Sequence, residues 1–491
     1  MKTSIRSSVV VNLIRTITMT VLSLVTFPLV CRLLGDSALG TFSWASSFIY
    51  YFIVLSKISI PNVAVRECAK VKDDPVKLSM KVQEFFILQA IMTVLSFGLM
   101  CLLVFTVPSF KDNQSIIFIL SINFLISVFA FEWVFTALEK HTYLAVRSII
   151  ILAIADILIF ALIKRPDDLY LYAFLTTVVT ILTVITNLIY LPSILKFKKV
   201  GKYNFKQYVP ILGVLFIISI LVAIYSKTDS FILGFIDSSK ASVGSYSVGM
   251  KGVDIVIGLI IALGAVFMPR ASYLVANKDF HEYKKLNAFS VNLCFVIIVP
   301  AIALLVTLAT PITSLISGAD GYAYANWVLV ALCSLIMTFS LCNIIYTQIL
   351  IPQKREKIYL IAMAIGCALN IALSLLFGLV FMKEMPAVGI AIATSITDLV
   401  ILIVLLGFTW KDMKTALFNW DNLKIIVLGG IITVFSIFVG PLVEKAFVES
   451  IGLEMAMLAE IGIIFVSSAI IYLIGLIVSR EKIVKTLFKK E

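Results

Sequence analysis

Residues 83–107 read QEFFILQAIMTVLSFGLMCLLVFTV, a stretch in which Glu84 is the only charged residue. A helix needs about 20 mainly apolar residues to cross the hydrocarbon core of a bilayer, so this stretch is long enough to span a membrane. Its apolar residues follow one another without the apolar–polar alternation that is typical of membrane barrel strands. The stretch therefore predicts a transmembrane α-helix.

Comparable apolar runs recur along the chain and bring the expected number of spans to fourteen. They lie at 9–31, 41–64, 115–137, 142–163, 169–195, 209–235, 244–268, 288–310, 325–350, 358–381, 386–408, 424–441 and 455–478. The chain is 61% hydrophobic and 14% charged, whereas soluble domains are about 45–50% apolar and about 25% charged. We therefore expect an all-α polytopic membrane protein with 14 transmembrane helices, and not a soluble enzyme.

The basic residues behind the net charge of +12 are unevenly distributed along the chain. Lys and Arg gather in alternate connecting segments, such as 66–81, 196–206 and 270–285, and are sparse in the segments between them. Cytoplasmic loops of membrane proteins carry this excess, so we expect cytoplasmic N- and C-termini and a basic cytoplasmic tail. The same placement argues against nucleic-acid binding.

An internal repeat relates the first two expected helices to the seventh and eighth. Each pair is joined by a short turn, at 33–43 and at 233–247, in which Asp-Ser is followed by a Gly two residues before an aromatic residue. The offset of six helices keeps the chain direction, as in the parallel repeats of transporters. We expect two pseudo-symmetric six-helix lobes, 1–206 and 207–415, and a C-terminal helix pair with the basic tail, 416–491.

Short motifs near the start of the chain carry a family resemblance. They are Phe27-Pro28-Leu29, Arg32-Leu33-Leu34-Gly35, and Pro61-Asn62-Val63-Ala64-Val65-Arg66-Glu67. Together with segment 229–251, they resemble Wzx-type polysaccharide, oligosaccharide or teichoic acid flippases of the multidrug/oligosaccharidyl-lipid/polysaccharide (MOP) exporter superfamily. The resemblance implies a MATE-like fold with two lobes around a cavity, in the bacterial plasma membrane.

The same resemblance implies a function. Such proteins move an undecaprenyl-diphosphate-linked glycan from the inner to the outer leaflet by alternating access. The substrate class includes capsule or O-antigen repeat units and teichoic acid precursors. The implied partners are this lipid-linked glycan, membrane lipids, and glycan polymerases or glycosyltransferases.

Four basic residues fall in the interior of the expected helices: Arg15, Lys57, Lys227 and Lys251. Arg147 and Lys424, near the starts of the spans 142–163 and 424–441, are counted with the adjoining cytoplasmic segments. A cation at the bilayer centre costs about 2.5–3.5 kcal/mol on insertion scales, so we expect these side chains to face one water-accessible cavity. Arg and Lys replace the lost hydration of a phosphate with charge-assisted hydrogen bonds. We therefore expect them to bind the substrate diphosphate.

Acidic residues in the expected helices have two open interpretations. Asp156, Asp229, Asp254, Asp398 and Glu132 could be counter-charges to the four cations or could couple transport to Na⁺ or H⁺. Lys251 and Asp254 are three residues apart and so share a helical face, which leaves an internal salt bridge open. Lys227 has Asp229 two residues on, and an internal salt bridge is left open for this pair too.

Motifs for enzymatic chemistry are missing from the sequence. Gly201-Lys202 is followed by Tyr203, which does not fit a P-loop, and Lys285 stands where an HExxH motif starting at His281 needs its second histidine. We expect no catalytic residues, no metal site and no cofactor, and hence no enzyme.

Three alternatives to the expected function remain. A lipid II flippase has the same span number and a cationic cavity. A cation-coupled MATE-like multidrug exporter needs acidic cavity residues, whereas the first helix carries Arg15 and no carboxylate. A glycan polymerase or ligase commonly has a large extracytoplasmic loop, for which the outer segments here are too short.

Overall fold

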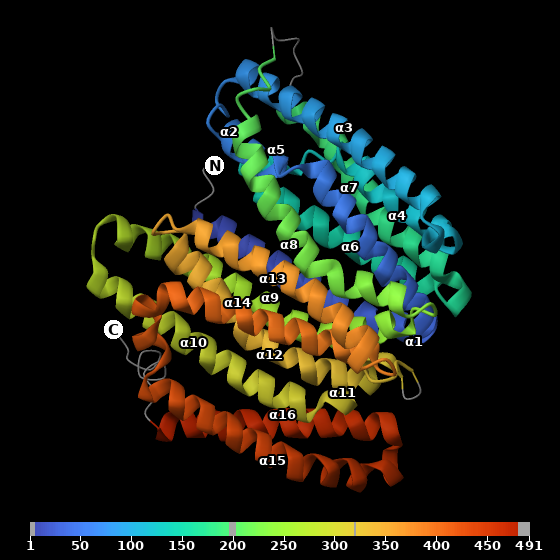
Figure 1. The fold of residues 1–491 in the computed structure, drawn as a ribbon, viewed down its shortest axis with the longest axis vertical. Helices are drawn as coiled ribbons and strands as arrows, with labels where there is room; N and C mark the ends of the chain where they lie inside the picture. Colours follow the sequence, from blue (N-terminus) through green and yellow to red (C-terminus); the bar gives the residue numbers. More distant parts are fainter. Residues whose placement is uncertain (1–4, 196–202, 319–320, 480–491) are drawn as a thin grey trace. The chain divides into compact units, whose positions relative to one another are not determined.

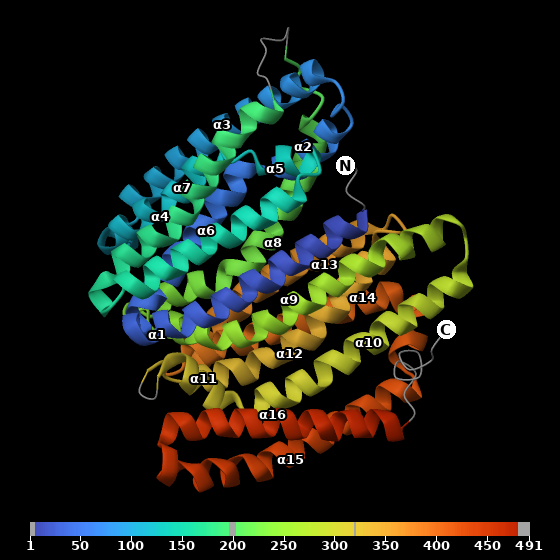
Figure 2. The same ribbon diagram turned by 180° about the vertical axis from the view of Figure 1, so that it is seen from behind.

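The computed structural model describes residues 5–195, 203–318 and 321–479, and within these ranges it contains helices and no strands (Figures 1 and 2). The expected basic tail after 479 lies outside the described residues. The all-α fold class is confirmed. Among the described residues, twelve helical segments are long and apolar enough to cross a membrane, and the first of them, Ile14–Ala69, covers most of the first expected span and all of the second. The exact number of fourteen stays a prediction.

The chain divides by its internal contacts into two units, Met1–Ala241 and Ser242–Glu491. The main helices of the first unit are α1 (Ile5–Lys57), α2 (Ile60–Ala69), α3 (Pro75–Thr106), α4 (Gln114–Ser127), α5 (Glu132–Ala137), α6 (His141–Leu162), α7 (Leu169–Ile194) and α8 (Val209–Ile236). Those that follow are α9 (Ala241–Ala276), α10 (Phe280–Thr307), α11 (Ala309–Ser317), α12 (Ala325–Ile344), α13 (Glu356–Leu376), α14 (Pro386–Leu417), α15 (Trp420–Ile451) and α16 (Leu453–Val478). Short helical turns are η1 (Pro108–Asn113), η2 (Pro166–Asp168), η3 (Ile345–Leu350) and η4 (Phe377–Phe381).

The surface of the helices has the polarity of a membrane protein. On α3, Val94, Leu102 and Phe105 are 70%, 59% and 68% exposed, and their spacing places them along one side of the helix. Small polar side chains pair between helices instead, as with the half-buried Thr180, whose hydroxyl donates to Asn123 Oδ1 at 2.6 Å. Exposed apolar stripes of this size are costly in water, whereas buried polar contacts are the usual adhesive between membrane helices.

The first expected span and most of the second form one element, α1, with a sharp bend. The second span, expected at 41–64, is interrupted at Ile58 and Ser59, which have positive φ, and continues in α2. Gly35 at the bend has φ 77° and ψ 174°, a conformation that glycine adopts readily and other residues do not. Figure 2 shows α1 as two arms that meet at this corner. The short turn predicted between the two spans is therefore present, and it is reduced to a single non-helical glycine.

The expected span at 115–137 is broken. Helix α4 ends at Ser127 and the short helix α5 starts at Glu132, after Phe131 with φ 49°. The break leaves carbonyl groups without intrahelical partners, and Ala130 O accepts a hydrogen bond from Asn187 Nδ2 of α7 at 2.5 Å. A contact from a distant helix satisfies a backbone group that lipid could not, which is why the apolar run alone did not predict it.

Helix α8 packs against α1 inside the first unit. The division into two units by contacts therefore falls after α8, whereas the predicted lobe boundary at 206/207 lies before α8. The internal repeat of six helices stays a prediction. The approach is close because Gly234 meets Trp44, and a Cβ at Gly234 would lie 2.0 Å from Trp44 Cδ1. Lys240 adds to this contact: its Nζ donates to Gly234 O at 2.8 Å and lies 4.6 Å from the Trp44 ring centre.

A buried carboxylate holds the segment that leads into α8. Glu84 of α3 is fully buried and accepts hydrogen bonds from Asn204 N at 2.8 Å and from Tyr208 Oη at 2.5 Å. Lys81 Nζ is 3.8 Å from the same carboxylate. The one charged residue of the stretch that predicts the third span is therefore compensated and anchors the start of α8 to α3.

The C-terminal helices α15 and α16 form a hairpin through Gly452, whose φ is 80°, and lie side by side (Figure 1). Helix α15 packs on α10, where Asn292 donates to Asn422 Oδ1 at 3.1 Å. Tyr472 of α16 donates to Val296 O of α10 at 2.9 Å. The expected C-terminal helix pair is confirmed as a structural feature of residues 420–478.

Candidate functional site

Two of the four predicted binding cations, Arg15 and Lys57, lie on the two arms of α1. Arg15 is about 30 Å before the bend at Gly35 and Lys57 about 33 Å after it, at 1.5 Å of rise per residue. The two residues are thus at similar depths, near the ends of the arms that are far from the bend. With the N-terminus expected to be cytoplasmic, this end of α1 is expected on the cytoplasmic side, and the orientation stays a prediction.

Arg15 and Lys57 are both half-buried. Among the residues that the structure describes, neither side chain forms an ion pair. The carboxylate of Glu132 interacts electrostatically with Lys57. Ile14 and Ile17 beside Arg15 are 54% and 55% exposed, so Arg15 lies at the border of an accessible apolar face.

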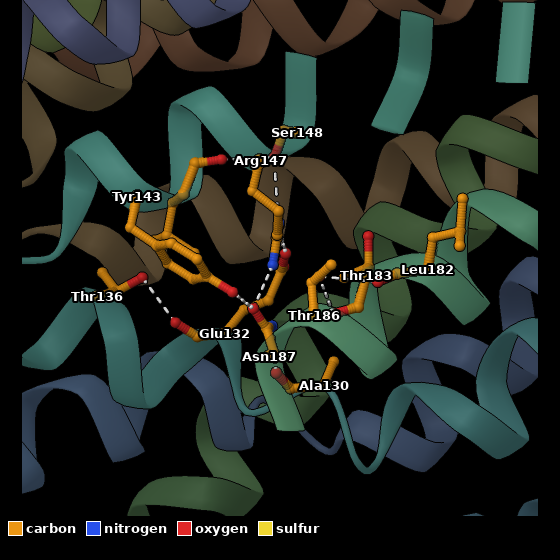
Figure 3. Close-up of polar contacts among 11 residues, drawn as sticks. Ala130, Glu132, Thr136, Tyr143, Arg147, Ser148, Leu182, Thr183, Thr186 and Asn187 are labelled. Atoms are coloured by element: carbon orange, nitrogen blue, oxygen red, sulfur yellow. Dashed lines mark hydrogen bonds and ion pairs between the residues drawn. The ribbon is translucent and has the colours of Figure 1, made fainter. Parts of the chain in front are cut away.

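Glu132, predicted as a counter-charge to the helix cations, forms an ion pair with Arg147, which lies near the start of the expected span 142–163. Arg147 of α6 is 6% exposed, and its Nη2 lies 2.5 Å from Glu132 Oε1. Its Nη1 donates to Asn187 Oδ1 at 2.7 Å. Figure 3 shows Glu132, Arg147 and Asn187 pointing toward one another from α5, α6 and α7.

The two ends of this ion pair differ in accessibility. The Arg147 side chain is 5% exposed and the Glu132 side chain 48% exposed. Tyr143 closes the buried side, since its hydroxyl donates to Asn187 Oδ1 at 3.0 Å and its ring centre is 5.9 Å from Arg147 Cζ. Arg147 thus holds Glu132 from the buried side, and about half of the Glu132 side chain stays exposed. The Glu132–Arg147–Asn187 cluster was not predicted, and the signal that could have revealed it is an arginine inside helix-forming sequence.

Lys227, the third predicted cation, lies on α8. Its Nζ is 5.6 Å from the centre of the Tyr50 ring on α1, a distance at which cation–π attraction operates. Asp229, two residues further on, is 7% exposed. Residues two apart do not share a helical face, so the sequence neighbour Asp229 is not presented to the same side as Lys227.

Lys251, the fourth predicted cation, and Asp254 lie on α9 in the second unit, where Lys251 is half-buried and Asp254 exposed. A salt bridge between them stays a prediction. The shared cavity for all four cations involves both units and also stays a prediction.

Asp398 of α14 is the most enclosed of the predicted acidic residues in the second unit. It is 4% exposed, and Thr338 Oγ1 of α12 donates to its Oδ2 at 2.6 Å. One helical turn earlier, Thr394 Oγ1 accepts from Asn370 Nδ2 at 3.1 Å. A carboxylate, hydroxyls and an amide are therefore gathered between α12, α13 and α14.

Asp156 of α6 is 7% exposed. Its Oδ2 has no hydrogen-bond partner within the described ranges, and Thr26 of α1 is its polar neighbour. Groups of three or more metal-binding side chains do not occur in the part of the chain that the structure describes.

Comparison with known proteins places this architecture in a family. The family model described as polysaccharide biosynthesis protein matches residues 5–275, which include both arms of α1, the Glu132–Arg147–Asn187 cluster and Lys227. The chain belongs to the polysaccharide biosynthesis protein family. A second model, MatE, matches residues 215–376, so the predicted membership in the MOP exporter superfamily is confirmed.

Family relatives and solved structures agree with this placement. The chain is 24% identical over 396 residues to "Putative O-antigen transporter" of Escherichia coli (strain K12), covering 78% of this chain and 92% of the relative. Its fold is similar to lipid II flippase MurJ in an inward closed conformation, with a TM-score of 0.63, 19% identity, and coverage of 96% of this chain and 99% of that one. An inward-facing MATE family multidrug resistance transporter of the MOP superfamily gives a TM-score of 0.60 at 13% identity, covering 83% of this chain and 99% of that one.

Proposed function

We propose that this member of the polysaccharide biosynthesis protein family is a flippase. It moves an undecaprenyl-diphosphate-linked glycan from the inner to the outer leaflet of the bacterial plasma membrane by alternating access. The observation that carries the proposal is the state of Arg15 and Lys57, two helix cations that form no ion pair with the described residues. The family match over residues 5–275 supports it.

The chemistry of the substrate explains why two such cations would be retained. The diphosphate is the most strongly hydrated part of the lipid-linked glycan, and a charged group in a low-dielectric site is stable only with charged or hydrogen-bonding partners. Arg15 supplies a planar fork of donors, and Lys57 a compact ammonium. Glu132, held by Arg147, balances the positive charge of Lys57 while no substrate is bound. When substrate binds, its phosphate replaces Glu132 as the counter-charge of Lys57.

The membrane potential favours the proposed direction. Each elementary charge that crosses 100 mV changes in free energy by about 2.3 kcal/mol, so an inside-negative potential drives an anionic diphosphate outward. The transport cycle therefore needs no nucleotide, and we propose a transporter and not an enzyme.

Depletion of the protein from its host tests the substrate class. We expect an undecaprenyl-diphosphate-linked repeat unit to accumulate in the cytoplasmic leaflet, measured by extraction and mass spectrometry of lipid-linked saccharides together with a leaflet-specific label. Re-expression of the intact chain should clear it. Accumulation of lipid II would favour the alternative flippase, and unchanged lipid-linked saccharides with increased drug sensitivity would overturn the proposal in favour of a multidrug exporter.

We propose Asp398 as the residue that couples transport to Na⁺ or H⁺. Oxygen ligands suit hard cations, and Thr338, Thr394 and Asn370 place such groups on the helices around this carboxylate. In proteoliposomes, Asp398→Asn should lower the stimulation of transport by an imposed Na⁺ or H⁺ gradient at least tenfold. Asp156→Asn is the matched control, since Asp156 is also buried inside a helix, and we expect it to keep its gradient stimulation. Full gradient stimulation in Asp398→Asn would remove Asp398 from this role.

A further inference from the structure

A pocket with a volume of about 470 Å³ opens where α14 meets α15. Phe295 of α10 lines its inner end, and Leu417, Phe418, Trp420, Leu423 and Ile426 line its walls together with two asparagines. Phe418 and Trp420 are 75% and 78% exposed. All of these lining residues except Phe295 belong to the segment 416–491, which lies outside the predicted repeat.

The polar groups of the lining are already engaged. Asn422 Nδ2 donates to Ala416 O and Leu417 O, both at 2.9 Å, and its Oδ1 accepts from Asn292. Asn419 accepts from Asn422 N at 2.8 Å and donates to Ala416 O at 2.9 Å. These bonds hold the turn between α14 and α15 and engage both lining asparagines, so the side-chain lining is otherwise apolar apart from the indole N–H of Trp420. The pocket therefore suits a hydrocarbon chain and not a sugar or a phosphate.

The rim of the pocket carries positive charge. Lys411 and Lys414 are exposed on the last turns of α14. Lys411, Lys414 and Phe418 follow the i, i+3, i+7 spacing of one helical face, and Phe418 lines the pocket. Trp410 is exposed beside them, and Trp marks the membrane–water interface. The excess of lysine in this connection predicts the cytoplasmic side.

We propose that this pocket binds an acyl chain of an anionic glycerophospholipid from the cytoplasmic leaflet. Its phosphate lies toward Lys411 and Lys414, and its chain enters between Phe418, Trp420 and Ile426. The site is distinct from the glycan site on α1 and goes beyond the proposed function. The two lysines set the preference for an anionic headgroup, because the apolar walls contact only the acyl chain.

Native mass spectrometry of the full chain, released from bilayers of phosphatidylglycerol and phosphatidylcholine, tests the pocket. Ile426→Trp should fill it and abolish the retained phosphatidylglycerol. Ile431→Trp is the matched control, since Ile426 and Ile431 are both 48% exposed on the same helix and Ile431 does not line the pocket. Equal retention by the two variants would overturn the proposal.

A second pair of variants tests the rim without altering the packed interior. Lys411→Gln with Lys414→Gln should weaken phosphatidylglycerol binding about 25-fold, roughly fivefold for each lysine near an anionic surface, and leave phosphatidylcholine unchanged. Lys445→Gln, an exposed lysine on the predicted outer side, should have no effect. Equal affinity for both lipids, or displacement of the bound lipid by undecaprenyl phosphate at lower concentration than by phosphatidylglycerol, would overturn the assignment.

Discussion

Replacement of Glu132 with alanine is expected to lower the free energy of unfolding by about 3–5 kcal/mol, because removing one partner of a buried ion pair leaves the other charge uncompensated. That other charge belongs to Arg147, whose side chain is 5% exposed. Unfolding of the purified protein in a denaturing detergent, followed by circular dichroism, measures the change.

The accessibility of the two partners predicts the order of a variant series. Arg147→Leu leaves the half-exposed Glu132 to water and costs Asn187 one hydrogen-bond partner, so we expect a smaller loss of about 1–3 kcal/mol. The double variant should be close to Arg147→Leu alone, since it leaves no buried charge. Glu282→Ala breaks the exposed pair with Lys285, whose atoms are 2.8 Å apart, and should cost less than about 1 kcal/mol. A larger loss in Arg147→Leu than in Glu132→Ala would contradict the assigned burial.

The helices were predictable from the sequence because membrane spans depend on composition and length, which are local. The interruption at Phe131 was not, since it depends on Asn187, more than fifty positions away, capturing the carbonyl of Ala130. Long-range packing also explains why the partners of Arg147 were not predicted. Its neighbours in sequence include Lys140 and His141, which are typical of a loop, and only the fold brings Glu132 and Asn187 to it.

The candidate site shows the same division between local and distant information. That Arg15 lies inside a helix followed from the apolar run around it. Lys57, expected inside the span 41–64, is instead the last residue of α1, before Ile58 and Ser59 with positive φ. Which carboxylate pairs with which cation depends on how the helices pack. The sequence alone could pair Glu132 with any of the helix cations, whereas in the structure Glu132 forms its ion pair with Arg147 of α6. The position of Lys227 against Tyr50 likewise required α8 to pack on α1, which the repeat alone did not predict.

Replacement of Arg15 with alanine is expected to abolish transport of the lipid-linked glycan while expression and folding are retained. Arg15 forms no ion pair within the described ranges, so its removal strands no buried partner and the folded state loses little. Complementation of a depleted host, with surface glycan as the readout and membrane abundance as the reference, measures this. Lys383→Ala, an exposed cation on the predicted outer side, is the control and should transport normally.

Conservative variants separate a binding role for Arg15 from a general need for positive charge. Arg15→Lys keeps the charge but replaces the planar fork of donors with a single ammonium, so it should restore transport only in part, because a diphosphate accepts a bidentate arginine better than a lysine. Lys57→Arg should retain most activity, since Lys57 acts as a charge between Glu132 and the phosphate. Normal transport by Arg15→Ala would place the phosphate elsewhere and remove the argument that joins the two arms of α1 to the substrate.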